Sequence, residues 1–125
     1  MPNNEEAPQV DNSCKWAGGG FISTVDDLLS FGKVLMEGKL INEETMSMAL
    51  ETHTLPDGKK TNRGIGFAVG EDKKGRKWTG HGGGSVGGSS MFLLYPQYDM
   101  CVVTLINQSQ ARSGDLAFRI AEQFI

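Results

Sequence analysis

Several residue types are scarce in this sequence, and each scarcity excludes a class of protein. The 125 residues include 12 basic and 15 acidic side chains, which gives a net charge of −3. Without an excess of Lys and Arg, there is no basic surface of the kind that binds nucleic acid. No apolar run approaches the ~20 residues that a membrane-spanning helix needs. The start, Met1–Glu6, is polar and acidic and does not have the pattern of a signal peptide.

Cysteine is also scarce, with Cys14 and Cys101 as the only two. They form no metal-ligand spacing, and we expect neither a metal site nor a cofactor. Cys101 lies in an apolar run and is expected to be a buried thiol. A Cys14–Cys101 disulfide remains open, because sequence alone does not decide connectivity.

Glycine, in contrast, is abundant, and six of the 17 glycines lie in residues 78–90. A glycine run costs backbone entropy and packs nothing, so it needs a structural or functional reason. In a strand, that reason is usually the close approach of a ligand or of another backbone. We interpret the run as a strand edge opened for a substrate, with His81 facing it. The alternative is a flexible loop that carries a surface histidine.

The first half of the chain predicts helices after an irregular lead-in over residues 1–15. Ser23 or Thr24 is placed to cap a helix that Gly38 ends, and its apolar residues recur at helical spacing. Asn42 is placed to cap a second helix over residues 43–50. Residues 16–55 therefore form the predicted helical segment, and Trp16 and Trp78 are both expected in the core.

From Gly64 the pattern changes to that of strands. Alternating apolar residues over 64–69 predict a first strand, and 76–81 should return antiparallel to it after a turn at 71–75. Residues 89–95 and 100–107 form a second predicted hairpin, apolar enough to be covered on both faces. A helix from Ser113 should pack on the sheet. The predicted fold class is α+β: a helical segment followed by an antiparallel meander and a closing helix, with residues 64–125 forming the sheet and that helix.

Two segments resemble one known family. Residues 16–31 resemble the "AGG-hydrophobic-ST-x-x-DL-x-x-F" segment of serine β-lactamases and penicillin-binding proteins, and residues 80–90 resemble the "GH-T-GG-x-x-G-x-S" strand of their class C, esterase and LACTB-type branch. The two motifs keep the order of that family, and the similarity extends over residues 15–125. The resemblance implies the C-terminal part of a β-lactamase or transpeptidase-like domain.

The resemblance also implies roles for a set of residues. His81 takes the position of the lysine in the K-T-G element of the family, and Gly82 takes that of a threonine whose hydroxyl is therefore missing. The amide of Gly84 would be one oxyanion donor, and Gly83 and Ser85 would line the substrate. The structural alternative for His81 is an imidazole satisfied by neighbouring backbone.

The nucleophile is the element that the resemblance does not find. The one S-x-x-K match, Ser30–Lys33, falls in the middle of a predicted helix, whereas the serine of the family starts a helix far upstream of the AGG segment. Ser30 is therefore interpreted as an ordinary helix-surface residue. The family's Tyr-x-Asn element does not occur either. We expect the nucleophile and general base to belong to a missing N-terminal segment.

Two function classes follow from these observations. The first is a serine hydrolase acting on peptide, ester or β-lactam carbonyls, of which this chain supplies one active-site wall and is inactive alone. The alternative is a non-catalytic homologue that binds a peptide or a partner protein. The expected partners are a small-molecule or peptide substrate and the missing segment; self-association is also open. The compartment stays undetermined, and periplasmic or secreted localisation would fit a bacterial full-length protein.

Overall fold

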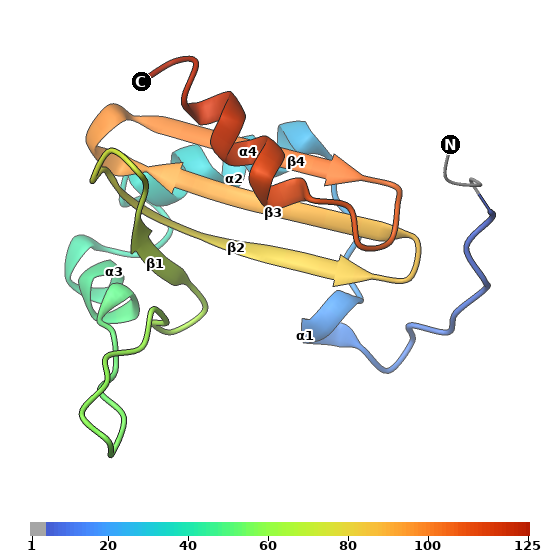
Figure 1. Cartoon of the computed structure of the whole chain (residues 1–125), viewed down its shortest axis with the longest axis horizontal. Helices are drawn as coiled ribbons and strands as arrows, with labels where there is room; N and C mark the ends of the chain where they lie inside the picture. The colour runs from blue at the N-terminus through green and yellow to red at the C-terminus, as the bar shows by residue number, and fades with distance from the viewer. Residues whose placement is uncertain (1–4) are drawn as a thin grey trace.

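The computed structural model describes residues 5–125 and has one four-stranded antiparallel sheet with helices on both faces (Figure 1). The strands pair in sequence order, so the sheet is a meander. This is the predicted α+β class. The strands are β1 (Ala68–Glu71), β2 (Lys77–Ser85), β3 (Gly88–Tyr95) and β4 (Met100–Ile106).

The helices begin where their capping residues predict. Thr24 accepts a hydrogen bond from the Asp27 N–H at the start of α2, and Asn42 does the same for Thr45 at the start of α3. One further helix, a single turn before α2, was not predicted. The helices are α1 (Trp16–Gly19), α2 (Val25–Met36), α3 (Glu43–Leu50) and α4 (Ser113–Ala121), with a 3-10 turn η1 (Pro96–Tyr98) between β3 and β4.

The two faces of the sheet are covered to different degrees. On the α4 face, Leu93 and Tyr95 pack with Ala117 and Ala121, all at most 1% exposed. On the α2 face, Phe92 and Val103 are only half-buried, and Leu105 is 39% exposed. The prediction that β3 and β4 are covered on both faces therefore holds for the α4 face and only in part for the α2 face.

The first predicted strand is misplaced. Residues 64–67 form a turn, in which the Gly64 N–H donates to the Phe67 carbonyl and Gly66 has a φ of +77°. Ile65 is consequently 66% exposed, and β1 starts only at Ala68. The second predicted strand is too short, because β2 does not stop at His81: the glycines that follow continue the strand, paired with β3.

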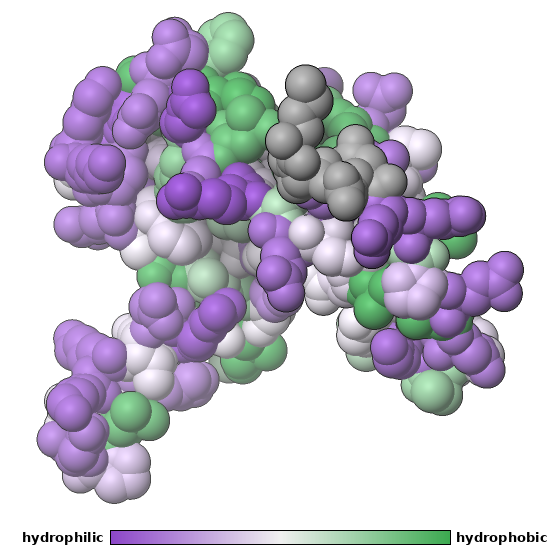
Figure 2. Space-filling model, turned by 45° about the vertical axis from the view of Figure 1, so that its right-hand side comes forward, coloured by the Kyte–Doolittle hydropathy of each residue, from purple (hydrophilic) through white to green (hydrophobic). Residues whose placement is uncertain are grey.

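The two tryptophans have different environments. Trp78 packs edge-on against Phe118 of α4, with ring centroids 5.2 Å apart, as predicted for a core residue. Trp16 is 75% exposed, so its predicted core position is wrong. It lies in α1, a helix of four residues that buries no side chain. Other exposed apolar residues contribute to the green patches among the polar surface in Figure 2.

Candidate functional site

The glycine-rich half of β2 has one unpaired edge. β2 pairs with β3 from Thr79 to Ser85, but with β1 only from Lys77 to Gly80. From His81 onward, no strand within residues 5–125 pairs with the other edge. All five residues from His81 to Ser85 are exposed. The predicted opening of a strand edge therefore exists, and the strand itself brings the five predicted site residues together.

The register shows which backbone groups face this edge. Ser85 and Gly88 flank the two-residue turn of the β2–β3 hairpin, so they form a hydrogen-bonded pair. Because N–H groups alternate between the two edges of a strand, those of Gly83 and His81 also point toward β3. The N–H groups of Gly82 and Gly84 then point to the unpaired edge. Two backbone donors are thus available there to a bound molecule.

The glycines of β2 fall into two groups when a Cβ is placed on each. At Gly80 it would lie 2.2 Å from the Phe92 carbonyl oxygen, so the sheet itself requires glycine. At Gly84 it would meet no atom within 4 Å, and at Gly82 only the Met91 Sδ at 3.5 Å and the Ser90 carbonyl oxygen at 3.8 Å. Internal packing does not explain glycine at these two positions.

His81 lies at the start of the unpaired edge. It is opposite Phe92, whose ring packs on Phe31 of α2 with centroids 5.5 Å apart, so the imidazole projects from the α2 face. The residue is exposed, and no residue of the described range forms a hydrogen bond with its imidazole. The structure therefore does not show the alternative in which neighbouring backbone groups form hydrogen bonds with the imidazole. The imidazole is free to form a hydrogen bond with a bound molecule.

The serines near this edge lack an activating partner. Ser85 is exposed at the end of β2. Ser89 is buried, and its hydroxyl donates to the Gln108 carbonyl at 2.9 Å. Ser90 packs against the backbone of Gly83, where a Cβ would lie 2.6 Å from its Oγ. A nucleophilic serine needs an adjacent base, and none of these three has a side-chain hydrogen bond to one.

Ser30 is unsuited to be the nucleophile, as expected. It is exposed in the middle of α2, and its hydroxyl donates to the Asp26 carbonyl at 2.8 Å. Such a bond to the preceding turn is common for serine inside a helix. No hydrogen bond joins Ser30 to Lys33 within the part of the chain that the structure describes.

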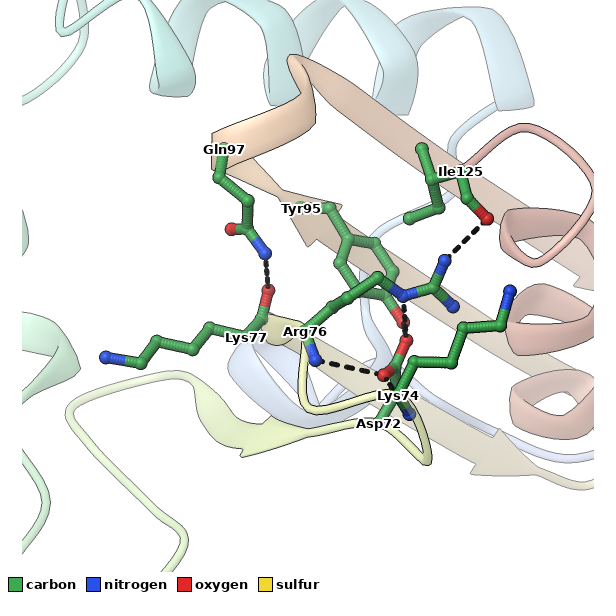
Figure 3. A network of polar contacts seen from close by, with 7 residues as sticks. All are labelled: Asp72, Lys74, Arg76, Lys77, Tyr95, Gln97 and Ile125. Carbon is green, nitrogen blue, oxygen red and sulfur yellow. Dashed lines mark hydrogen bonds and ion pairs between the residues drawn. The ribbon is translucent and has the colours of Figure 1, made fainter.

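The other end of β2 carries a buried polar network that was not predicted from the sequence (Figure 3). The Arg76 Nε donates to Asp72 Oδ2 at 2.6 Å, and the Tyr95 hydroxyl donates to the same oxygen at 3.2 Å. Arg76 also donates to the Ile125 carbonyl at 2.6 Å. The network ties the β1–β2 turn to β3 and to the segment after α4. A signal for this network is present in the sequence, because Asp72 and Arg76 are four residues apart on either side of a glycine turn.

This network shifts two pKa values in opposite directions. Burial raises the pKa of Asp72, but hydrogen bonds from the Arg76 and Lys74 backbone, the Arg76 side chain and Tyr95 outweigh it and lower the value to about 2. Burial and the neighbouring Asp72 charge raise the pKa of Tyr95 to about 12. Both groups thus keep one protonation state at neutral pH. This fits a structural role rather than proton transfer.

The two cysteines are not bonded to each other. Cys14 is exposed, whereas Cys101 is half-buried against α2, and burial raises its pKa to about 11. A thiol with such a pKa is a poor nucleophile at neutral pH. Among residues 5–125, no group of three or more His, Cys, Asp or Glu is placed to hold a metal ion. None of the described helices is long and apolar enough to cross a membrane.

Comparisons with known proteins agree on one family. The family model described as Beta-lactamase matches residues 1–124. The mitochondrial serine beta-lactamase-like protein LACTB of Bos taurus and that of Homo sapiens are each 36% identical over 115 aligned residues, which cover 72% of this chain. The alignment covers 21% of either relative, so the chain spans about a fifth of their length.

Two solved structures share the fold. A D-stereospecific amidohydrolase from Streptomyces sp. superposes with a TM-score of 0.65 at 22% identity, over 78% of this chain and 29% of that one. A penicillin-binding protein from Bacillus halodurans superposes with a TM-score of 0.66 at 22% identity, over 81% and 31%. The architecture is therefore that of the β-lactamase and transpeptidase fold in part.

Proposed function

The chain belongs to the β-lactamase family, and from this premise we propose that it supplies one wall of the active site of a serine hydrolase. The observation that carries the proposal is the unpaired edge of β2, where the Gly84 amide faces outward beside the exposed imidazole of His81. The nucleophilic serine and its base belong, in this proposal, to a segment that these 125 residues do not contain. The substrate is a peptide, ester or β-lactam carbonyl.

The Gly84 amide would act on the carbonyl oxygen of the substrate. When a serine hydroxyl attacks the carbonyl carbon, the oxygen gains negative charge, and an N–H fixed in a strand stabilises it without reorganising. The amide of the nucleophile would be the second donor. The carbon–leaving-group bond then breaks, the leaving group takes a proton, and water hydrolyses the acyl-enzyme. Removing one oxyanion donor typically lowers kcat by about 10²–10³-fold.

His81 would bind or protonate the part of the substrate that lies over the α2 face. An imidazole can both donate and accept a hydrogen bond, whereas the lysine that the family places here only donates. Gly82 removes the threonine hydroxyl that the family commonly has. A substrate carboxylate would thus have one hydrogen bond fewer at this edge, which favours substrates without an obligatory carboxylate.

A non-catalytic homologue is the second candidate. An unpaired strand edge binds an extended peptide by adding it as a strand, with no acylation step. The observation that favours this candidate is the lack of an activated serine in the described chain, since Ser30 and Ser89 both donate to backbone carbonyls. The two candidates use the same edge and differ in whether a covalent adduct forms.

The first experiment incubates the purified chain with a fluorescent penicillin or a fluorophosphonate and examines it by mass spectrometry. We expect no covalent adduct, since no serine in it is paired with a base. A stoichiometric adduct on Ser30 or Ser85 would show that the nucleophile has been misassigned.

The second experiment uses the complete reading frame and an ester or β-lactam reporter. Gly84→Pro removes the outward N–H and is expected to lower kcat/KM by about 10²-fold or more. Gly84→Ala is the matched control, because it keeps the N–H and its Cβ meets no atom within 4 Å. His81→Ala should also lower kcat/KM, with His53→Ala as the exposed control. Equal activity of the proline and alanine variants would refute the oxyanion role, and a complete protein that never forms an adduct would favour the binding homologue.

A further inference from the structure

The amide of Gly84 lies in the type of backbone that is least restrained by its own side chains. Five of the seven residues 82–88 are glycine, and glycine has more conformational freedom than any other residue. An oxyanion donor stabilises negative charge because it is fixed in place before the reaction and needs no reorganisation. A restraint from outside the glycine run is therefore needed if this amide is to act.

Gly84 does not form this restraint with its own backbone N–H. That group points to the unpaired edge, and Gly84 has no side chain that could pack. The backbone bonds that hold this part of β2 to β3 come from its neighbours on either side, Gly83 and Ser85. The residue of β3 directly opposite Gly84 is Ser89. The position of the Gly84 amide therefore depends on how firmly Ser89 is held.

Ser89 is held by a side-chain hydrogen bond that reaches past the end of the sheet. It is 7% exposed and alternates along β3 with the core residues Met91 and Leu93, so its side chain lies on the α4 face. Its hydroxyl donates to the Gln108 carbonyl at 2.9 Å. The pairing of β3 with β4 ends at Ser89 and Ile106, so this bond adds an attachment beyond the last pair.

The residue after Gln108 holds the turn of the same hairpin. The Gly87 N–H donates to the Ser109 Oγ at 2.7 Å. Gly87 has a φ of +76°, the left-handed conformation that a two-residue hairpin turn requires. The loop after β4 is thus bonded to the β2–β3 hairpin at two points, one opposite Gly84 and one at the turn.

We propose that Ser89 and Ser109 are positioning residues, which hold the Gly84 amide where the oxyanion forms. Neither serine contacts the substrate, because Ser89 lies on the opposite face from His81 and Ser109 acts through the turn. The role rests on the proposed hydrolase function, since a displaced amide affects a rate only if an oxyanion forms beside it. A displacement of about 1 Å can lower a rate about 10²-fold. Loss of one of the two bonds should therefore lower kcat by about tenfold.

The kinetic test uses the complete reading frame with the ester or β-lactam reporter. Ser89→Ala and Ser109→Ala should each lower kcat by about tenfold and leave KM within about twofold of the wild-type value. Ser109→Thr keeps the hydroxyl at an exposed position and should restore kcat.

Thr104→Val is the matched control for a loss of stability without a loss of position. The Thr104 hydroxyl is also buried and donates to a backbone carbonyl, that of Ser113, at 3.0 Å. It lies on β4, which does not pair with β2. Thr104→Val should lower the Tm about as much as Ser89→Ala does and leave kcat unchanged. Equal kcat values for Ser89→Ala and Thr104→Val would overturn the positioning role.

Amide hydrogen exchange in the chain alone distinguishes a failure of this role from a failure of the hydrolase function. In Ser89→Ala, the Gly83 and Ser85 amides, which bond to β3, should exchange about tenfold faster than in the wild type. The Trp78 amide, which bonds to β1, should not change. Unchanged exchange at Gly83 and Ser85 would overturn the positioning role even in an active hydrolase. Faster exchange in a protein whose complete form never makes an acyl adduct would instead overturn the hydrolase function, and with it any catalytic effect of Ser89.

Discussion

The two ends of β2 are built in opposite ways. Near Arg76, side chains are buried and hydrogen-bonded to one another, and β2 pairs with β1 from Lys77 and also with β3 from Thr79. From His81 to Ser85, the residues are exposed, three of the five are glycines, and the strand pairs with β3 alone. The first end fixes the strand, whereas the second offers backbone donors to solvent. The difference indicates that a rigid attachment at one end holds the unpaired edge at the other in place.

Arg76→Leu should have the largest effect on stability. It leaves the buried carboxylate of Asp72 without its ion pair, and breaking such a pair is strongly destabilising. We expect the Tm to fall by about 10 °C or more, measured by circular dichroism. Lys74→Ala is the control, because only the Lys74 backbone contacts Asp72. An unchanged Tm in the Arg76 variant would mean that this end of β2 is not a fixed attachment.

Gly80→Ala and Gly84→Ala compare how a Cβ added near each end of β2 changes the stability of the protein. A Cβ at Gly80 would lie 2.2 Å from the Phe92 carbonyl oxygen, so the sheet must shift. We expect Gly80→Ala to lower the free energy of unfolding by ~1–3 kcal/mol. Gly84→Ala meets no neighbouring atom and should change it by less than about 0.5 kcal/mol. Urea unfolding of both variants would measure the change in the free energy of unfolding. Similar decreases in the two variants would show that the sheet does not require glycine at Gly80 more than at Gly84.

The network also predicts how stability depends on pH. The folded pKa of Asp72 is lowered from 3.8 to about 2, so its contribution is present above pH 4 and is lost as the pH falls toward 2. The folded pKa of Tyr95 is raised from 10.0 to about 12, so its contribution is present below pH 10 and is lost as the pH rises toward 12. The folded pKa of Cys101 is raised from 9.0 to about 11, so its contribution to stability is lost as the pH rises between these two values.

Near neutral pH, the contribution of these groups should therefore be constant. Thermal unfolding at a series of pH values would measure the acid and alkaline steps. Asp72→Asn should remove the acid step attributed to Asp72, and Tyr95→Phe the last alkaline one. If the acid and alkaline losses of stability persist unchanged in these variants, other groups must cause them.

The sequence predicted those parts of the fold that local chemistry specifies. Thr24 and Asn42 are capping residues, and α2 and α3 begin directly after them. The apolar runs of β3 and β4 also led to the correct strands. The first strand was misplaced because alternation does not show where a turn ends: Gly66, with its positive φ, places Ile65 outside the sheet. Trp16 was assigned to the core on residue type alone, although nothing in α1 is buried.

The candidate site was predicted in composition but not in geometry. The glycine run indicated an opened strand edge, and the family motif pointed to His81 and Gly84. Which amides face the unpaired edge depends on the pairing of Ser85 with Gly88 and on where β1 begins, and both are tertiary properties. The spacing of Asp72 and Arg76 around a glycine turn is a local signal, but no local pattern links this pair to Tyr95 of β3.

Amide hydrogen exchange along β2 tests the central claim, a strand held at one end and unpaired along one edge at the other. In NMR spectra of the chain, Gly82 and Gly84 should exchange rapidly, because their N–H groups face solvent. His81 and Gly83, between and beside them, should be protected by their bonds to β3. Such alternation within four consecutive residues would establish the two free donors on which the proposed oxyanion site depends. Equal protection of all four amides would show that the N–H groups of Gly82 and Gly84 are not free at this edge.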